Sequence, residues 1–256
     1  MGRRNLDLGE MAIGLPKTEL VYLDDMNRRK DEANIIRVVP EKRTHAYLVL
    51  DRTIFHAKGG GQPSDRGTMQ TATFKLTVKK ALHHNGVILH WGKLVEGIPT
   101  EGPVTSELDW NYRYLVMRRH TTAHLLDHCL ASTTGKRVQT TDSWLDEPCY
   151  VGYAGRPPDQ EVLHKVEEMG NEMIRKGAPV RIEFLSREES GRALQNAPNF
   201  DRLPDLEEVR IVTIAGCEPI PCGGTHISDI SEIGKFSVLR AEEMPTQSFR
   251  LHFSVS

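Results

Sequence analysis

The feature that most constrains this chain is a pair of short segments, far apart in the sequence, that each offer two metal-binding side chains. The first is HTTAH, residues 120–124, within a helical pattern of apolar residues. Residues four apart in a helix share a face, so His120 and His124 can reach one ion. The second is PCGGTH, residues 221–226, whose two glycines let the backbone turn tightly enough for Cys222 and His226 to converge.

Together the four side chains offer three imidazole nitrogens and one sulfur, a set that suits tetrahedral zinc. Either pair alone is also compatible with exposed or hydrogen-bonded side chains, but the presence of both favours a Zn2+ site. A zinc protease is excluded, because its His-Glu-x-x-His places a general base between the histidines. Here the intervening residues are Thr121, Thr122 and Ala123. The other cysteines are interpreted as small core residues: Cys129, Cys149 and Cys217.

Residues 18–108 show the pattern of a small β-barrel domain. Apolar or alternating runs of strand length occur at 46–50, 74–78 and 87–91. Asn85 and Gly86 separate the last two runs, and this dipeptide is favoured in tight hairpins. Residues 1–17 mix charge and glycine without periodicity, so we expect a flexible extension there.

Residues 109–256 change character, because helical periods appear among the strands. Helices are expected at 111–131, stopped by Gly135, and at 159–176, and a capping box at 186–189 predicts a short third helix. In the second helix one apolar face is expected to consist of Val162, Val166, Met169 and Met173. Strands are expected at 209–214, 236–239 and 249–255. The predicted fold class is α+β: an N-terminal small β-barrel domain, then an α+β domain with an antiparallel sheet and packed helices.

Composition narrows the function classes. A chain of 256 residues can bury a core without disulfides, and four cysteines do not form a dense disulfide framework. No apolar run approaches the roughly 18 residues of a membrane span, and the first residues lack a secretory signal, so we expect a cytoplasmic protein. A net charge of −2 argues against holding nucleic acid by bulk electrostatics, but it allows a local basic patch.

Three separated motifs resemble one family, the editing domain of alanyl-tRNA synthetase and its freestanding AlaX relatives. The first comprises HTTAH, PCGGTH and the sequence EIG at 232–234. The second is the glycine-rich segment DRTIFHAKGGGQPSDRG at 51–67. The third is the opening LVYLDD at 20–25. The motifs occur in the expected order, and the resemblance covers roughly residues 18–256.

The resemblance implies a middle-length AlaX protein, in which residues 109–256 form a zinc-binding editing domain. It implies hydrolysis of the ester in mischarged alanine tRNA, principally Ser-tRNA, with Gly-tRNA as a further candidate. The family's zinc ligands carry over to His120, His124, Cys222 and His226. One departure concerns the Gln-x-Gly-Ser stretch that lines the family's substrate pocket. Here residues 138–143 read VQTTDS, without the glycine.

Thr53 and Gln62 are the candidates for contacting the amino acid, given this resemblance. A threonine hydroxyl can hydrogen-bond a serine side chain, and alanine would leave that hydroxyl unpaired. Residue types alone also allow Thr53 to be an ordinary strand residue and Gln62 a turn residue. The further candidates for the substrate site are Gly60, Gly61, Gln139, Gly223, Gly224 and Thr225.

Basic residues near the histidine helix are the candidate tRNA contacts. They are Arg113, Arg118 and Arg119, together with Arg28, Arg29 and Lys30. Charged residues on a helix more often form a face that is exposed to solvent. The assignment of these residues as phosphate contacts therefore depends on the expected tRNA partner.

The chemistry leaves two roles open for zinc. It can activate a water, if a ligand is loose or the coordination expands, or it can fix the Cys222–His226 loop while other groups hold the water. We favour the second role, because four protein ligands leave no open position. Two other functions also remain open: a non-catalytic zinc-containing tRNA-binding module, and a zinc hydrolase of an ester that is not a tRNA.

Overall fold

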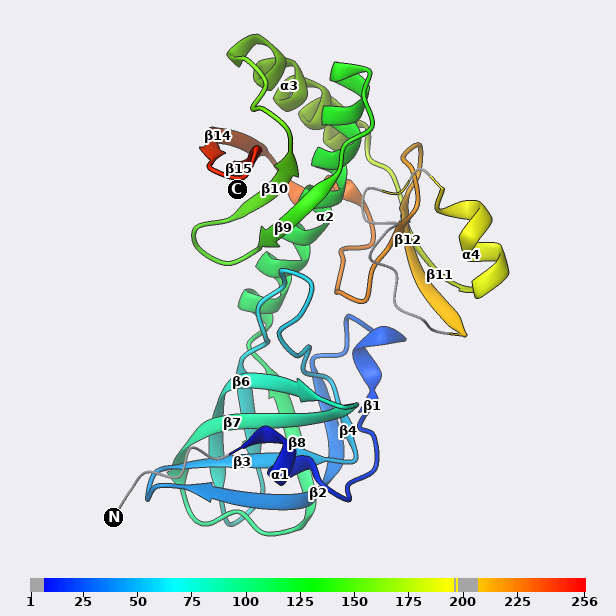
Figure 1. Cartoon of the computed structure of the whole chain (residues 1–256). Helices are drawn as coiled ribbons and strands as arrows, with labels where there is room; N and C mark the ends of the chain where they lie inside the picture. Colours follow the sequence, from blue (N-terminus) through cyan, green and yellow to red (C-terminus); the bar gives the residue numbers. More distant parts are fainter. Residues whose placement is uncertain (1–6, 196, 198–206) are drawn as a thin grey trace. The chain divides into compact units, whose positions relative to one another are not determined.

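The computed structural model describes residues 7–195, 197 and 207–256. The chain forms two compact units (Figure 1). The first comprises Met1–Gly59 and Pro63–Arg113, and the second comprises Gly60–Gln62 and Tyr114–Ser256. The mixture of helices and antiparallel sheets expected from the sequence is confirmed. The domain boundaries after residues 17 and 108 remain predictions.

Six antiparallel strands of the first unit close into a barrel, in the order β2-β3-β7-β6-β5-β8 (Figure 1). They are β2 (Lys30–Glu41), β3 (His45–Leu50), β5 (Gly67–Gln70), β6 (Lys75–His84), β7 (Val87–Glu96) and β8 (Gly102–Leu108). Leu48, Leu76 and Ile88 are among the buried side chains of its core. The β6–β7 hairpin turns at Asn85 and Gly86, whose φ angles of 48° and 85° are those that Asn-Gly readily adopts.

The prediction of a flexible extension over residues 1–17 is wrong for residues 7–17, and residues 1–6 lie outside the described part. Helix α1 (Leu8–Ala12) buries Met11 and Ala12 in a small cluster with Val49, Val87 and Leu89. Two apolar residues are too few to produce a periodic signal, and their packing partners come from distant strands. After α1, strand β1 (Glu19–Leu20) pairs in parallel with β4 (Arg52–Thr53), and η1 (Val21–Leu23) follows.

Helix α2 (Trp110–Thr134) is the longest element of the chain's described part. Between Val116 and Leu130 it is buried on nearly every side, rather than along the single apolar stripe that the sequence predicted. The buried residues include the polar side chains of His120 and His124. Gly135, with φ 64°, follows the helix where the sequence predicted its end.

Two antiparallel sheets accompany α2 in the second unit, ordered β14-β15-β10-β9 and β11-β12-β13. Their strands are β9 (Thr140–Trp144), β10 (Tyr150–Ala154), β11 (Val180–Ser186), β12 (Glu208–Ile214), β13 (Ile220–Pro221), β14 (Phe236–Met244) and β15 (Ser248–Val255). The remaining helices are α3 (Gln160–Lys176), α4 (Arg187–Ala193) and η3 (Ile230–Ile233). The capping box expected at Ser186 and Glu189 is present at the start of α4. No helix among the described residues is both long and apolar enough to cross a membrane.

Helix α3 (Gln160–Lys176) agrees with the helix expected at 159–176 to within one residue; Asp159 is its N-cap and Gly177 follows it. Its buried face differs from the prediction, because it consists of Leu163, Val166, Gly170 and Ile174. The predicted residues Val162, Met169 and Met173 are only half-buried at its edge. The prediction counted only apolar side chains, so it could not place glycine on the buried face. Gly170 nevertheless lies there, against the ring of Phe236.

Gly170→Ala should destabilise the second unit, because an added Cβ would lie 2.2 Å from Cε1 of the buried Phe236 ring. The ring is fully buried, and the backbone that carries it is held by Asn171, which hydrogen-bonds both the N–H and the carbonyl oxygen of Phe236. Such overpacking costs about 1–3 kcal/mol. Chemical denaturation measures the loss. Gly191→Ala in α4 is the control, because its Cβ meets open space; equal stability of the two variants would contradict the packing described.

Candidate metal centre

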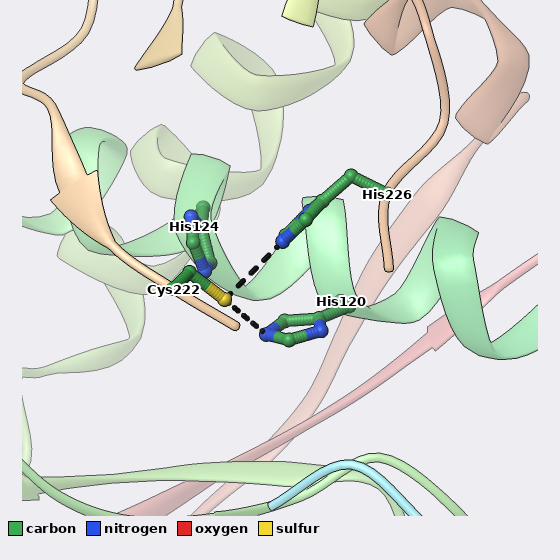
Figure 2. A group of neighbouring side chains, drawn as sticks. All are labelled: His120, His124, Cys222 and His226. Atoms are coloured by element: carbon green, nitrogen blue, oxygen red, sulfur yellow. Dashed lines mark hydrogen bonds between the residues drawn. The ribbon is translucent and has the colours of Figure 1, made fainter. Parts of the chain in front are cut away.

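The four side chains predicted as ligands come together in the second unit (Figure 2). Their potential ligand atoms all lie within 4.8 Å of one another. His120 and His124 project from adjacent turns of α2, Cys222 follows β13, and His226 precedes η3. The Sγ atom of Cys222 lies 3.4 Å from Nε2 of His120 and 3.4 Å from Nε2 of His226. The cluster could therefore hold a metal ion.

The separations fit such an ion. Bonds of about 2.3 Å to sulfur and 2.0–2.1 Å to nitrogen at a tetrahedral angle place the two atoms roughly 3.5 Å apart. The observed distance of 3.4 Å from the Cys222 sulfur to Nε2 of His120 and to Nε2 of His226 agrees with this value. The Nδ1 atoms of His120 and His226 are turned to other partners, Oε1 of Gln62 at 2.9 Å and Oγ1 of Thr121 at 3.1 Å. Such outer contacts are typical of metal-bound histidines.

The hydroxyl of Thr121 makes a second hydrogen bond, which fixes the direction of its contact with His226. Its hydroxyl donates to the carbonyl oxygen of Met117 at 3.0 Å. The hydroxyl oxygen therefore accepts the hydrogen bond from Nδ1–H of His226. The Nε2 lone pair of His226 then faces the sulfur of Cys222. The threonine between the two helix histidines therefore orients the third histidine, a contact that the sequence did not predict.

Arg210, on β12, supports the loop that carries Cys222. Its Nη1 donates to the carbonyl oxygens of Cys222 at 2.6 Å and Gly224 at 3.0 Å, while the N–H of Cys222 donates to the Arg210 carbonyl at 3.0 Å. Arg210 is only 7% exposed. The sequence analysis missed this residue, although a lone arginine inside the apolar run 209–214 was a signal that could have identified it.

The surroundings favour neutral side chains. Burial, assisted by the positive charge of Arg210, lowers the pKa of His124 to about 4. Neutral imidazole is the form that binds metals. Burial raises the pKa of the Cys222 thiol, while the N–H of Gly224 and the charge of Arg210 act in the opposite direction. A bound cation would also lower the pKa of the Cys222 thiol and so favour the thiolate.

The two glycines of the loop differ in their surroundings. A Cβ on Gly224 would lie 2.2 Å from Cε1 of His120 and 2.6 Å from Oε1 of Gln62. A Cβ on Gly223 would meet nothing within 4 Å. Gly224 is therefore required for the close approach of the loop to His120, whereas Gly223 is exposed and has no such constraint.

The candidate substrate residues lie in different settings. Gln62 and Thr225 are buried together beside His120. Gln139 is exposed just before β9, and Gly60 and Gly61 form a turn with φ angles of 55° and 82°. These positions do not test contact with a substrate, which stays a prediction.

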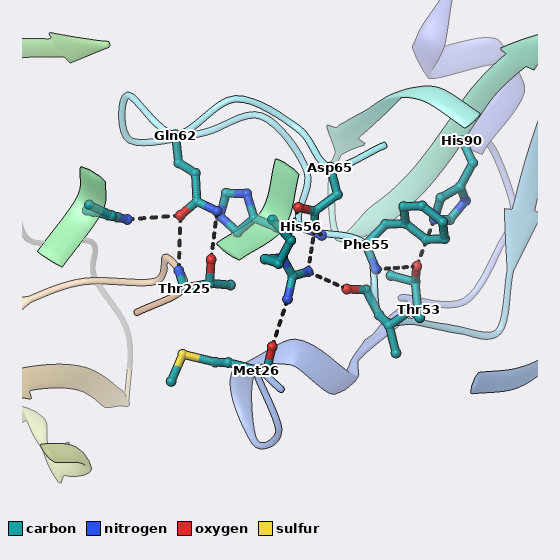
Figure 3. Close-up of polar contacts among 11 residues, drawn as sticks. Met26, Thr53, Phe55, His56, Gln62, Asp65, His90 and Thr225 are labelled. Carbon is teal, nitrogen blue, oxygen red and sulfur yellow. Dashed lines mark hydrogen bonds and ion pairs between the residues drawn. The ribbon is translucent and has the colours of Figure 1, made fainter. Parts of the chain in front are cut away.

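Thr53 is buried in the first unit. Its hydroxyl lies 2.8 Å from Nε2 of His90 (Figure 3). Nδ1 of His90 lies 3.0 Å from the carbonyl oxygen of Leu48. Burial lowers the pKa of His90 to about 4, so this histidine is neutral. Its Nδ1–H donates to the Leu48 carbonyl, and its Nε2 therefore accepts a hydrogen bond from the Thr53 hydroxyl. The structure gives Thr53 a partner inside the protein, and its contact with an amino acid stays a prediction.

Arg113, Arg118 and Arg119 each have hydrogen-bond partners within the protein, and their contact with tRNA stays a prediction. Arg113 is fully buried and donates to Asp65 and to the carbonyl oxygens of Ile54 and Met26. Arg118 donates to the carbonyl oxygens of Ile233 and Ser256, and Arg119 bonds Glu147 and the carbonyl oxygen of Leu145. Charge on a helix could not reveal these partners, because they come from distant parts of the sequence.

A cavity of about 310 Å³ adjoins the cluster along α2. His124 forms part of its wall, and the neighbouring lining residues include Asp127, Lys136 and Arg137. The carboxylate of Asp127 accepts a 2.6 Å hydrogen bond from the buried Tyr153 hydroxyl. The cavity is therefore lined by two acidic residues, Asp127 and Glu218, and by two basic ones, Lys136 and Arg137.

Two parts of the chain match known protein families. Residues 22–112 match the family described as tRNA synthetases class II (A). Residues 209–252, which contain Cys222 and His226, match the threonyl and alanyl tRNA synthetase second additional domain.

Individual relatives extend the similarity over nearly the whole chain. The alanyl-tRNA editing protein AlaX-L of Pyrococcus horikoshii is 34% identical over 242 residues, which cover 92% of this chain and 57% of the relative. The alanyl-tRNA editing protein AlaX-M of Methanosarcina barkeri is 27% identical over 93% of this chain and 99% of the relative. An alanine–tRNA ligase of Methanopyrus kandleri is 32% identical, and the chain spans 26% of its length.

Gly224→Ala should weaken metal binding, because the new Cβ must displace His120 or Gln62. Loss of outer contacts to a metal-binding histidine typically costs on the order of 10–100-fold in affinity. Competition with a chromogenic chelator, with zinc as the probe, measures the change. Gly223→Ala is the matched control and should bind as tightly as the unmodified chain; the same affinity in both variants would contradict the loop geometry.

Proposed function

We propose that this chain, which is similar over nearly its whole length to alanyl-tRNA editing proteins, belongs with them and hydrolyses the ester bond of mischarged alanine tRNA in the cytoplasm. Ser-tRNA is the proposed principal substrate, with Gly-tRNA as a second. The observation that carries the proposal is the convergence of His120, His124, Cys222 and His226 beside a cavity large enough for part of a ligand.

Zinc is the metal we propose for the cluster. Three imidazole nitrogens and one thiolate form a donor set typical of Zn2+. When bound, zinc supplies positive charge that can polarise an ester carbonyl or lower the pKa of a water toward ~7. Four protein ligands complete a tetrahedral site, and such closed sites are usually structural. We therefore assign the cluster to holding the Cys222–His226 loop in place, and the positioning of water to groups of the protein.

The cavity is the proposed place for the acylated end of the tRNA. Asp127 offers a carboxylate near His124, and this charge suits the α-ammonium group of an aminoacyl ester. Lys136 and Arg137 offer positive charge, which suits phosphates of the terminal nucleotides. It adds to the contacts expected at Arg113, Arg118 and Arg119, which stay predictions.

Two alternatives predict different behaviour. A non-catalytic tRNA-binding module would retain zinc and tRNA without hydrolysing the ester. A zinc hydrolase of another ester would not be inhibited by uncharged tRNA. The intact ligand set and the relatives' names favour the editing function over both.

Deacylation of Ser-tRNA and Ala-tRNA, both on the alanine tRNA, tests the proposal. We expect rapid loss of serine, sparing of alanine, and loss of the serine activity after zinc is removed by a chelator. Added zinc should restore the activity. Zinc and tRNA binding without hydrolysis of Ser-tRNA or Gly-tRNA would instead identify a binding module.

Lys136→Ala should raise KM for Ser-tRNA and leave kcat little changed, because a phosphate contact binds the substrate without taking part in bond cleavage. The slope of log(kcat/KM) against log salt concentration should also become shallower by about 1. Lys176→Ala is the control, since Lys176 is exposed at the end of α3 and pairs with Glu172. An unchanged salt slope in Lys136→Ala would place the tRNA phosphates elsewhere.

A further inference from the structure

Gln62 belongs to the glycine-rich segment that the sequence associated with substrate, yet its contacts lie within the candidate metal centre. The side chain is fully buried. Within the described part of the chain, its amide hydrogen-bonds to His120 and Thr225 (Figure 3). Both residues belong to the ligand-bearing elements, α2 and the Cys222–His226 loop.

The orientation of the Gln62 amide follows from its partners. The backbone N–H of Thr225, 3.0 Å away, can only donate, so the amide atom facing it must be the oxygen. The same oxygen lies 2.9 Å from Nδ1 of His120, which must therefore carry a proton. The amide nitrogen donates to the hydroxyl of Thr225 at 2.9 Å. All three contacts are satisfied at once by one rotamer and one imidazole tautomer.

In that tautomer Nε2 of His120 carries a lone pair, which is directed toward the sulfur of Cys222. If the proton were on Nε2 instead, Nδ1 and the Gln62 oxygen would both be acceptors at 2.9 Å, which is unfavourable. The amide thus selects the form of His120 that can bind a metal through Nε2, and it connects that ring to the loop through Thr225.

The glycines that precede Gln62 account for its placement. The carbonyl oxygen of Gly61 accepts from the N–H of Leu145 at 3.1 Å, so the turn is fixed against the β9 segment. A Cβ on Gly61 would lie 2.0 Å from Oγ of Ser143, and its φ of 82° also favours glycine. The turn therefore delivers Gln62 to His120 only when this position lacks a side chain.

We propose that Gln62 is a positioning residue of the metal centre, which fixes the tautomer of His120 and locks it to Thr225. The glycine-rich segment then acts on the metal ligands and not on the amino acid. This inference rests on the metal centre of the proposed function, but not on the identity of the ester that is hydrolysed.

Zinc affinity of the full chain, measured by chelator competition, tests the proposal without an activity assay. Gln62→Met removes the acceptor and should weaken zinc binding by on the order of 10–100-fold. Gln62→Glu keeps oxygen acceptors for His120 and Thr225, and it should bind zinc at least as tightly as the unmodified chain. Gln160→Met is the matched control, because Gln160 is exposed at the start of α3.

The absorption spectrum of the cobalt-substituted proteins adds a direct readout of the ligand set. We expect the thiolate-to-cobalt band and the tetrahedral d–d bands to be altered in Gln62→Met and retained in Gln62→Glu. If Gln62→Met fails to fold, as monitored by circular dichroism, Gln62→Asn takes its place, because its shorter side chain cannot span both partners.

The outcomes separate this inference from the proposed function. Unchanged zinc affinity and cobalt spectrum in the acceptor-lacking variant, with a change only in KM or in serine-over-alanine selectivity, would overturn the inference and return Gln62 to the substrate. Failure of the unmodified chain itself to bind zinc would overturn both the metal centre and the inference. Normal zinc binding without any deacylase activity would leave the inference intact and refute the editing function.

Discussion

Three imidazoles and one thiol share a space in which every potential ligand atom is within 4.8 Å of the others. Burying that many polar groups is costly unless each has a partner, and a single cation is a partner that all four can share. The surrounding contacts agree with this need. Thr121 and Gln62 engage the Nδ1 atoms of two rings, Arg210 holds the loop carbonyls, and burial keeps His124 neutral. Much of the second unit's polar interior is organised around this point.

Several residues that were expected to contact the substrate or tRNA also have partners within the protein. Gln62 and Gly224 shape the ligand cluster, and Arg113 neutralises Asp65 inside the first unit. A buried ion pair of this kind is costly to break by removing one partner, so Arg113 is constrained by its role inside the fold. Lys136 and Arg137, beyond the end of α2, are the exposed basic residues that line the cavity.

Local patterns predicted much of this structure from the sequence. The Asn85-Gly86 hairpin and the capping box of α4 depend on neighbouring residues, and both are present. The alternation of β15 holds for Phe249, Leu251 and Phe253 but not at its end, because His252 is buried and Val255 is only half-buried. The pairing of the two ligand segments was also predictable, because metal chemistry restricts which side chains can converge. The burial of Arg113, the packing of α1 and the role of Arg210 were not, since each depends on a partner that only the folded chain brings close.

The central claim is that one zinc ion is held by three imidazoles and the thiolate of Cys222. X-ray absorption at the zinc edge of the purified, zinc-loaded protein tests it most directly. We expect one sulfur at roughly 2.3 Å and three nitrogens at roughly 2.0–2.1 Å from the zinc ion. A spectrum without a sulfur shell, or with oxygen ligands in place of imidazoles, would contradict it.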